Sequence, residues 1–232
     1  MNRAEELKEN LAEVEERIAK ACEAAGRGRD EVMLLAVTKT WPASDVEILY
    51  GLGLRNFAEN RDQEAGEKVG QLRHLEEARW HMVGRLQRNK AKSVVEWADQ
   101  VDSVDSVRLA EALARAAHAK GRTLDVLLQV SIDGDTSRGG VAVADVAELA
   151  GVITRSGDLI LRGAMTVAPR TMNPSQAFQA LVSVVSRLRD HHPTAIGVSA
   201  GMSGDLEDAI SHGSTCVRVG TALLGSRRLI SP

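Results

Sequence analysis

The chain has 232 residues, of which 44% are hydrophobic and 26% charged, a composition typical of soluble globular proteins. Its formal net charge of −3 gives no reason to expect nucleic acid or an anionic membrane as a partner. Cys22 and Cys216 lie far apart, which argues against a disulfide framework or a zinc site. The charged first residues do not resemble a signal peptide, and no apolar run reaches the roughly 18 residues of a membrane span. We therefore expect a cytoplasmic protein with one domain over residues 1–232.

The first predicted element is a helix close to the N-terminus. Leu7, Leu11, Val14, Ile18 and Cys22 recur at helical spacing, and the sequence GRGRD ends the helix.

Eight short apolar runs follow and alternate with amphipathic segments. In chain order they read VMLLAVTK, LRNFAEN, WHMVG, QVDSVDS, DVLLQVS, LILRGAMTV, TAIGVSA and CVRVGTALLG. Alternation of strands and helices is typical of parallel βαβ units, and eight units in about 200 residues predict a single (β/α)8 TIM barrel with an extra N-terminal helix. The alternative is a doubly wound open sheet. That fold would have a glycine fingerprint after the first strand, where this chain reads TKTWP.

In such a barrel the active site lies at the C-terminal ends of the strands. Lys39 follows the first strand, Asn60 follows the second after Glu59, His81 ends the third and Met165 ends the sixth. The fifth strand leads into SIDGDTSRGG.

Two small-residue turns follow the last two strands. The first, SAGMSGDLEDAI, has Ser203 as its expected helix N-cap, with Asp205 and Glu207 in the first turns. The second, RVGTALLG, adds the hydroxyl of Thr221. Barrel enzymes often bind phosphate between these two loops, on open backbone N–H groups. The alternative is a pair of ordinary turns.

Arg218 lies in the apolar last strand, where a guanidinium needs hydrogen-bond acceptors. Its partner is either a neighbouring carboxylate or a ligand heteroatom. Lys39 lies at the same barrel end as the two turns, although a lysine alone is more often an ordinary surface residue. A lysine amine, a partner for a ring nitrogen and a phosphate site together favour pyridoxal 5′-phosphate (PLP).

Six motifs resemble, in order, those of the YggS/PROSC family of PLP-binding, PLP-homeostasis proteins. They are AVTKTWP, FAENRDQEA, WHMVGRLQRNK, GAMTVAP, SAGMSGDLEDAI and VRVGTALLG. The resemblance implies a barrel similar to the N-terminal domain of alanine racemase, with PLP held as a Schiff base on Lys39. It implies that Arg218 faces the pyridine nitrogen, and that Asn60, His81 and Met165 lie near the cofactor. The residues it places around the phosphate are Ser199, Gly201, Met202, Ser203, Gly220 and Thr221.

The sequence departs from the family pattern at two positions. Ala200 stands where the family often has methionine, and Arg138 stands where a lysine is common. Arginine keeps the positive charge but cannot form an imine.

The resemblance implies a non-catalytic, monomeric protein of vitamin B6 homeostasis, which holds PLP and passes it to apo PLP-dependent enzymes. The alternative is a weak PLP-dependent racemase. A two-base racemase needs a second base opposite the lysine, and alanine racemase uses a tyrosine from a separate domain. Here the single tyrosine, Tyr50, is expected on the outer layer, and no such domain is expected in a chain of 232 residues. An arginine at the ring nitrogen also makes the cofactor a weaker electron sink.

Two further function classes are disfavoured by the sequence. A barrel enzyme that uses a metal instead of PLP would need clustered carboxylates or histidines, but Glu59, His81 and Asp133 are scattered. The basic stretch at residues 85–93 could suggest nucleic-acid binding. Without interleaved aromatic residues, a charged helix face explains it better.

Overall fold

Parallel strands form a closed ring in the computed structural model, which describes residues 2–169 and 171–225. The ring runs in the order β1, β2, β3, β4, β5, β7, β8, β9, and β9 pairs back onto β1. The strands are β1 (Met33–Val37), β2 (Asn56–Glu59), β3 (Arg79–Met82), β4 (Gln100–Val104), β5 (Leu124–Ser131), β7 (Leu159–Met165), β8 (Gly197–Ser199) and β9 (Cys216–Val219). The predicted (β/α)8 TIM barrel is thereby confirmed, and each predicted apolar run contributes one strand of the ring.

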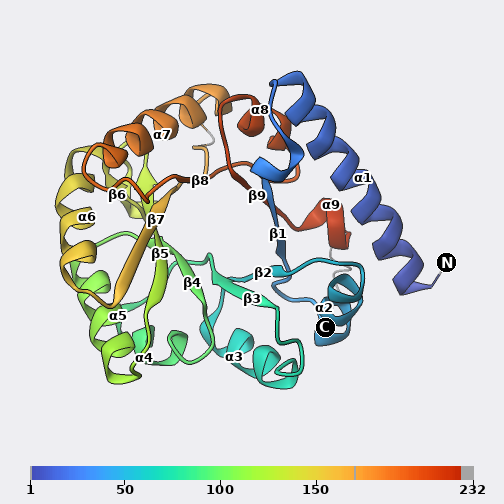
Figure 1. Ribbon diagram of the computed structural model, residues 1–232, viewed down its shortest axis with the longest axis horizontal. Coiled ribbons are helices and arrows are strands. Elements are labelled where there is room, and N and C mark those ends of the chain that lie inside the picture. Colours follow the sequence, from blue (N-terminus) through green and yellow to red (C-terminus); the bar gives the residue numbers. More distant parts are fainter. Residues whose placement is uncertain (1, 170, 226–232) are drawn as a thin grey trace.

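Helices cover the outside of the ring (Figure 1). They are α1 (Arg3–Ala24), α2 (Ala43–Gly51), α3 (Asp62–Gln71), α4 (Ala91–Val94), α5 (Val107–Ala119), α6 (Val146–Arg155), α7 (Pro174–Arg189), α8 (Leu206–Ser211) and α9 (Thr221–Leu224). Short 3-10 turns occur at η1 (Arg29–Glu31), η2 (Arg88–Lys90), η3 (Thr136–Arg138) and η4 (Val143–Asp145). The two-residue strand β6 (Val141–Ala142) pairs with the end of β5 outside the ring and was not predicted.

The apolar core lies mainly between the helices and the outer face of the ring. Leu34 and Ala36 of β1 belong to this large cluster, whereas Leu35 belongs to a small cluster with Ala58 and Cys216. Several polar side chains are buried as well, among them His81, Asp102, Ser199 and Arg218. Much of the barrel interior is therefore polar.

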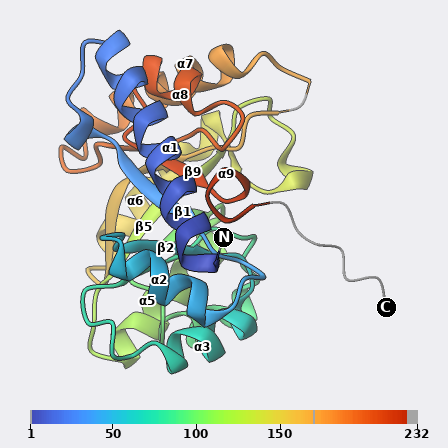
Figure 2. The same ribbon diagram turned by 90° about the vertical axis from the view of Figure 1, so that its right-hand side faces the viewer.

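The predicted N-terminal helix is present as α1. Asn2 and Glu5 form a reciprocal capping box at its start. Leu7, Val14 and Ile18 are fully or almost fully buried, so the helix is anchored by its apolar stripe. Figures 1 and 2 show α1 on the outside of the molecule, beside α8, α9 and α2.

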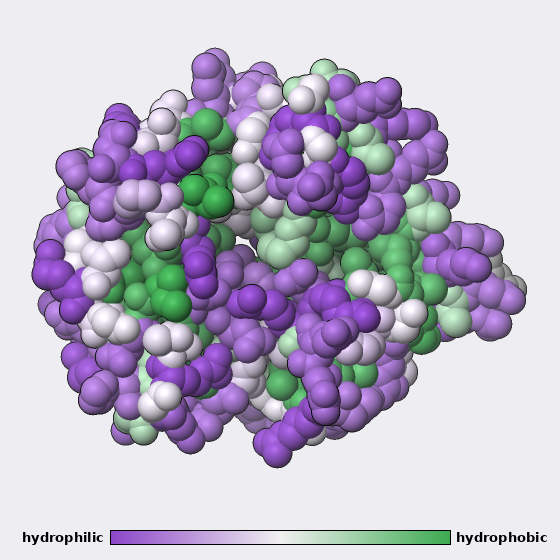
Figure 3. All heavy atoms as spheres, in the orientation of Figure 1, coloured by the Kyte–Doolittle hydropathy of each residue, from purple (hydrophilic) through white to green (hydrophobic). Residues whose placement is uncertain are grey.

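Polar residues cover most of the outer helices on the face shown in Figure 3, and a hollow lies near the centre of the ring. Within the described ranges, no helix combines the length and the apolar character that crossing a membrane requires.

Candidate functional site

Lys39 lies in a tight turn directly after β1. The Trp41 N–H donates to the Thr38 carbonyl at 3.1 Å, and Thr40 has a φ of +67°. A positive φ at the third residue is the signature of a type II turn, in which Lys39 is the second residue. Thr40 is the one non-glycine residue with positive φ in the described chain. A β-branched residue in this conformation is strained, and such strain is common at functional sites.

A buried network fixes the start of this turn. Lys68 of α3 donates from Nζ to the Thr38 carbonyl at 2.8 Å and to Glu59 Oε1 at 2.6 Å. The Thr38 hydroxyl also donates to Glu59 Oε1, at 2.7 Å. Lys39 Nζ itself has no hydrogen-bond or ion-pair partner among the described residues, so its amine is available to a ligand.

The turns after β8 and β9 are joined to each other. The Arg218 N–H donates to the Gly201 carbonyl at 3.0 Å, and the Ala222 N–H donates to Ser203 Oγ at 3.2 Å. Ser203 therefore caps the first turn of α9. The prediction that it caps the helix of its own segment was wrong. Asp205 holds the N-cap position of α8, and its carboxylate accepts from the Met202 N–H at 2.6 Å.

Gly201 makes the first of these turns possible. Its φ is +91°, and a Cβ there would lie 2.6 Å from Ala209 Cβ. In the described part of the chain, the N–H groups of Ser203, Gly204 and Thr221 find no protein acceptor. Unpaired amides grouped at tight turns form an anion-binding concavity.

Arg218 is buried in β9 and points toward the ends of β7 and β8. Nη1 donates to the carbonyl and the hydroxyl of Ser199, both at 2.8 Å, and Nη2 donates to the Thr166 carbonyl at 2.7 Å. Burial lowers the pKa of the guanidinium from its ordinary value. No carboxylate of the described chain forms an ion pair with it. Three of its five N–H donors are used, which leaves donors for a ligand heteroatom.

Asn60, Met165 and Ser199 lie at the same ends of their strands. Asn60 directly follows β2, and its Oδ1 atom is buried without a hydrogen-bond partner. The backbone of Gly84 lies directly against the backbone of Asn60. A side chain does not fit at this position, because a Cβ on Gly84 would lie 2.2 Å from the Asn60 carbonyl oxygen. Met165 and Ser199 end neighbouring strands in paired register.

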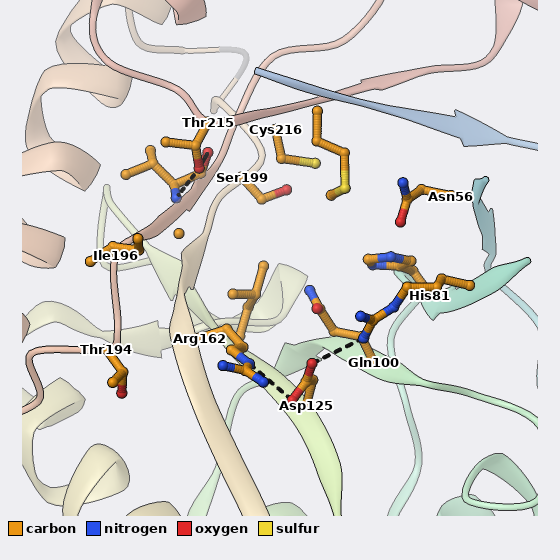
Figure 4. A pocket seen from close by; sticks show the side chains of 15 residues that line it. Asn56, His81, Gln100, Asp125, Arg162, Thr194, Ile196, Ser199, Thr215 and Cys216 are labelled. Carbon is orange, nitrogen blue, oxygen red and sulfur yellow. Dashed lines mark hydrogen bonds and ion pairs between the residues drawn. The ribbon is translucent and has the colours of Figure 1, made fainter. Parts of the chain in front are cut away.

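His81 lies deeper in the barrel than its predicted strand-end position. Nδ1 is 3.3 Å from Asp102 Oδ1, which also accepts from Gln100, and Nε2 is buried without a partner. The residue lines a pocket of about 420 Å³ at the amino ends of the strands (Figure 4). Arg79 and Arg162 both pair with Asp125 there. Lys39 and Arg218 do not line this pocket, so the role of His81 near the cofactor stays a prediction.

Three other features singled out in the sequence have surroundings of their own. Arg138 pairs with Asp133 and Asp135 of its own loop. Tyr50 lies in α2 on the outer layer, with the Arg55 guanidinium 4.1 Å from its ring centroid. The stretch at 85–93 forms η2 and the start of α4, where the basic side chains are exposed over a buried apolar side.

Comparison with known proteins identifies the class of barrel. The family described as "Alanine racemase, N-terminal domain" matches residues 9–228. A solved alanine racemase from Corynebacterium glutamicum has the same fold, with a TM-score of 0.69 at 15% identity, over 100% of this chain and 65% of that chain.

Closer relatives narrow the identity. The pyridoxal phosphate homeostasis protein of Mycobacterium tuberculosis is 49% identical over 100% of this chain and 96% of its own length. The Escherichia coli protein of that name is 36% identical over 96% of this chain and 97% of its own length. The structure of PipY from Synechococcus elongatus, solved with PLP bound, matches with a TM-score of 0.82 and 33% identity, over 94% of this chain and 100% of that one. The chain belongs to the family of pyridoxal phosphate homeostasis proteins.

Proposed function

We propose that the chain binds PLP at the carboxyl ends of the barrel strands and serves in PLP homeostasis without catalysing a reaction. The observation that carries the proposal is the arrangement of Lys39, Arg218 and the two turns around one barrel end. PLP supplies an aldehyde, an aromatic ring nitrogen and a phosphate, and the site offers a matching group for each. PipY, a relative at 33% identity, is solved with PLP bound.

Each part of the site has a proposed role. Lys39 holds the aldehyde carbon covalently through Nζ. Arg218 directs its remaining N–H donors at the ring nitrogen, since its carbonyl partners fix the guanidinium. The N–H groups of Ser203, Gly204 and Thr221 bind the phosphate, together with the neighbouring residues Ser199, Gly201, Met202 and Gly220. Asn60 and Met165 line the ring, and the unpaired Asn60 Oδ1 supports a polar contact there.

Several observations support holding the cofactor rather than using it. Two-base racemisation on PLP needs a second base opposite the lysine, and Tyr50 lies in the outer helix layer, stacked with Arg55. An arginine at the ring nitrogen keeps that nitrogen unprotonated, which weakens the cofactor as an electron sink. The curated relatives are named homeostasis proteins. We propose apo PLP-dependent enzymes in the cytoplasm as recipients, and a monomeric donor.

Borohydride reduction followed by peptide mapping tests the covalent link. Reduction of the PLP-loaded protein should leave a pyridoxyl group on Lys39. Lys90 and Lys92 are matched controls because they are exposed lysines of the same chain. Label found mainly on Lys90 or Lys92 would overturn the assignment.

Chiral analysis of alanine tests the absence of catalysis. After long incubation with stoichiometric loaded protein, we expect no D-alanine beyond the level seen with Lys39→Ala. Repeated turnover that disappears in Lys39→Ala would establish the chain as a racemase instead.

A further inference from the structure

Helix α1 lies against the helices that follow β8, β9 and β1, although it comes first in the chain (Figures 1 and 2). We propose that α1 orients the two phosphate-binding turns, and that Asn10 and Arg17 are the positioning residues. The inference rests on the proposed PLP site and adds to it a part of the chain outside the strand-end motifs.

Asn10 acts on the turn after β9 through helix α9. This helix has only four residues, too few to be stable alone. Its last carbonyl groups lack intrahelical donors. Asn10 Nδ2 donates to the Leu223 carbonyl and Arg3 Nη2 to the Leu224 carbonyl, each at 3.0 Å. Because backbone N–H groups in a helix all point toward its N-terminus, fixing these carbonyls also fixes the direction of the N–H of Thr221.

Arg17 acts on the turn after β8. Nη2 donates to the Ser203 carbonyl at 2.9 Å, and the guanidinium also holds the Glu207 carboxylate with contacts of 2.6 and 2.9 Å. The Ser203 carbonyl shares one planar trans peptide group with the Gly204 N–H, and the two point in opposite directions. Arg17 therefore turns the Gly204 N–H away from α1, where a ligand can reach it.

Helix α1 is itself firmly placed, as a positioning element must be. Its buried stripe includes Leu7, Val14 and Ile18. Arg3 pairs with Asp45 at 2.6 Å and lies over the Trp41 ring, 4.6 Å from the centroid. Trp41 ends the turn that carries Lys39, so α1 contacts all three loops of the proposed site.

A purely structural role for these contacts makes a different prediction from a positioning role. Loss of general stability would weaken PLP and pyridoxal alike. Loss of phosphate orientation would weaken PLP alone, because pyridoxal lacks the phosphate. The ratio of the two dissociation constants therefore distinguishes the roles.

The experiment measures apparent Kd for PLP and for pyridoxal by absorbance titration of the apo-protein in phosphate-free buffer. The test variants are Asn10→Leu, which keeps the side-chain size, and Arg17→Met. Arg17→Lys keeps one donor for the Ser203 carbonyl. Two controls lie on the same helix: Lys20→Met removes an exposed pair with Glu16, and Ile18→Val trims a fully buried side chain while the hydrogen bonds from Asn10 and Arg17 to the two turns stay in place.

We expect the preference for PLP over pyridoxal to fall about three- to tenfold in Asn10→Leu and Arg17→Met, the scale of one weakened bond to a charged group. Pyridoxal affinity should stay within about twofold, a small fraction of one such bond. Arg17→Lys should recover part of the preference, and both controls should keep it. If the wild type binds PLP normally and both test variants keep its preference for PLP over pyridoxal, the positioning role of α1 is wrong, while the proposed function stands. A wild type that binds no PLP would overturn the proposed function and the inference with it.

Discussion

The side chain of Lys68 shows how a single buried charge supports the turn that carries Lys39. It pairs with Glu59, and the two side chains are only 10% and 1% exposed. Removing one partner of a buried pair leaves the other charge uncompensated. We predict that Lys68→Met lowers the unfolding free energy by about 3–5 kcal/mol, measured by urea denaturation.

The double variant Glu59→Gln, Lys68→Met is the matched control for this pair. It removes both charges, so most of the lost stability should return. Exposed ion pairs contribute at most about 1 kcal/mol. If the unfolding free energy of Lys68→Met lies within about 1 kcal/mol of the wild-type value, the pair does not support the turn in the way described.

The thiol of Cys216 predicts a pH dependence. Burial raises its pKa from 9.0 to about 12, whereas the unfolded chain keeps the ordinary value. The resulting stability is complete below about pH 9 and is lost as the pH rises toward 12. Between these values, the unfolding free energy of wild type should fall by a few kcal/mol more than that of Cys216→Ala. Parallel curves for the two proteins would show that the thiol titrates normally in the folded state.

At the scale of elements, the turn after β8 depends on a glycine at one position and not at another. Gly201 has positive φ and no room for a Cβ, whereas Gly204 has open space around it. We predict that Gly201→Ala lowers the unfolding free energy by about 2–4 kcal/mol, from overpacking and backbone strain together. It should weaken PLP binding as well, since the turn carries N–H groups that we propose to bind the phosphate.

Gly204→Ala is the control within the same turn. It should change stability by less than about 1 kcal/mol, as substitutions away from packed sites usually do. Equal losses in the two variants would mean that the turn as a whole resists substitution, and that the Ala209 contact is not the cause.

At the scale of the whole molecule, local patterns predict the barrel well. The eight strands and the longer helices each follow from apolar periodicity within a short window. The sequence predicts Lys39, Arg218 and the two turns at one end of the barrel because the strand ends of a barrel meet on one side. The strand β6 was missed because it has two residues and little apolar pattern.

Contacts between distant segments could not be predicted in this way. The bonds from the Asn10 side chain to the Leu223 carbonyl and from the Ala222 N–H to Ser203 Oγ depend on how loops pack, which no local pattern records. His81 was placed at a strand end, yet its side chain faces the amino-end pocket, because strand length alone does not fix its depth. One signal was available: Lys68 lies between Ala65 and Leu72 on the buried side of its helix and therefore needs a partner.

The closed ring makes PLP a probe of global stability. The proposed contacts to the aldehyde, the ring nitrogen and the phosphate come from β1, β8 and β9, and β1 meets β9 only when the ring is closed. A ligand that binds only the folded state stabilises it by about 2.7 kcal/mol at a concentration of 100 Kd. We predict that PLP at this concentration raises the unfolding free energy by this amount, and so raises the urea midpoint, without changing the slope, because the surface exposed on unfolding stays the same. Pyridoxal at the same concentration is the control, since its aldehyde reacts with the same surface lysines but brings no phosphate. It should raise the midpoint much less, and Lys39→Ala should reduce the effect of PLP. Equal stabilisation by PLP and pyridoxal would mean that the aldehyde alone binds, and that the two turns do not hold the phosphate.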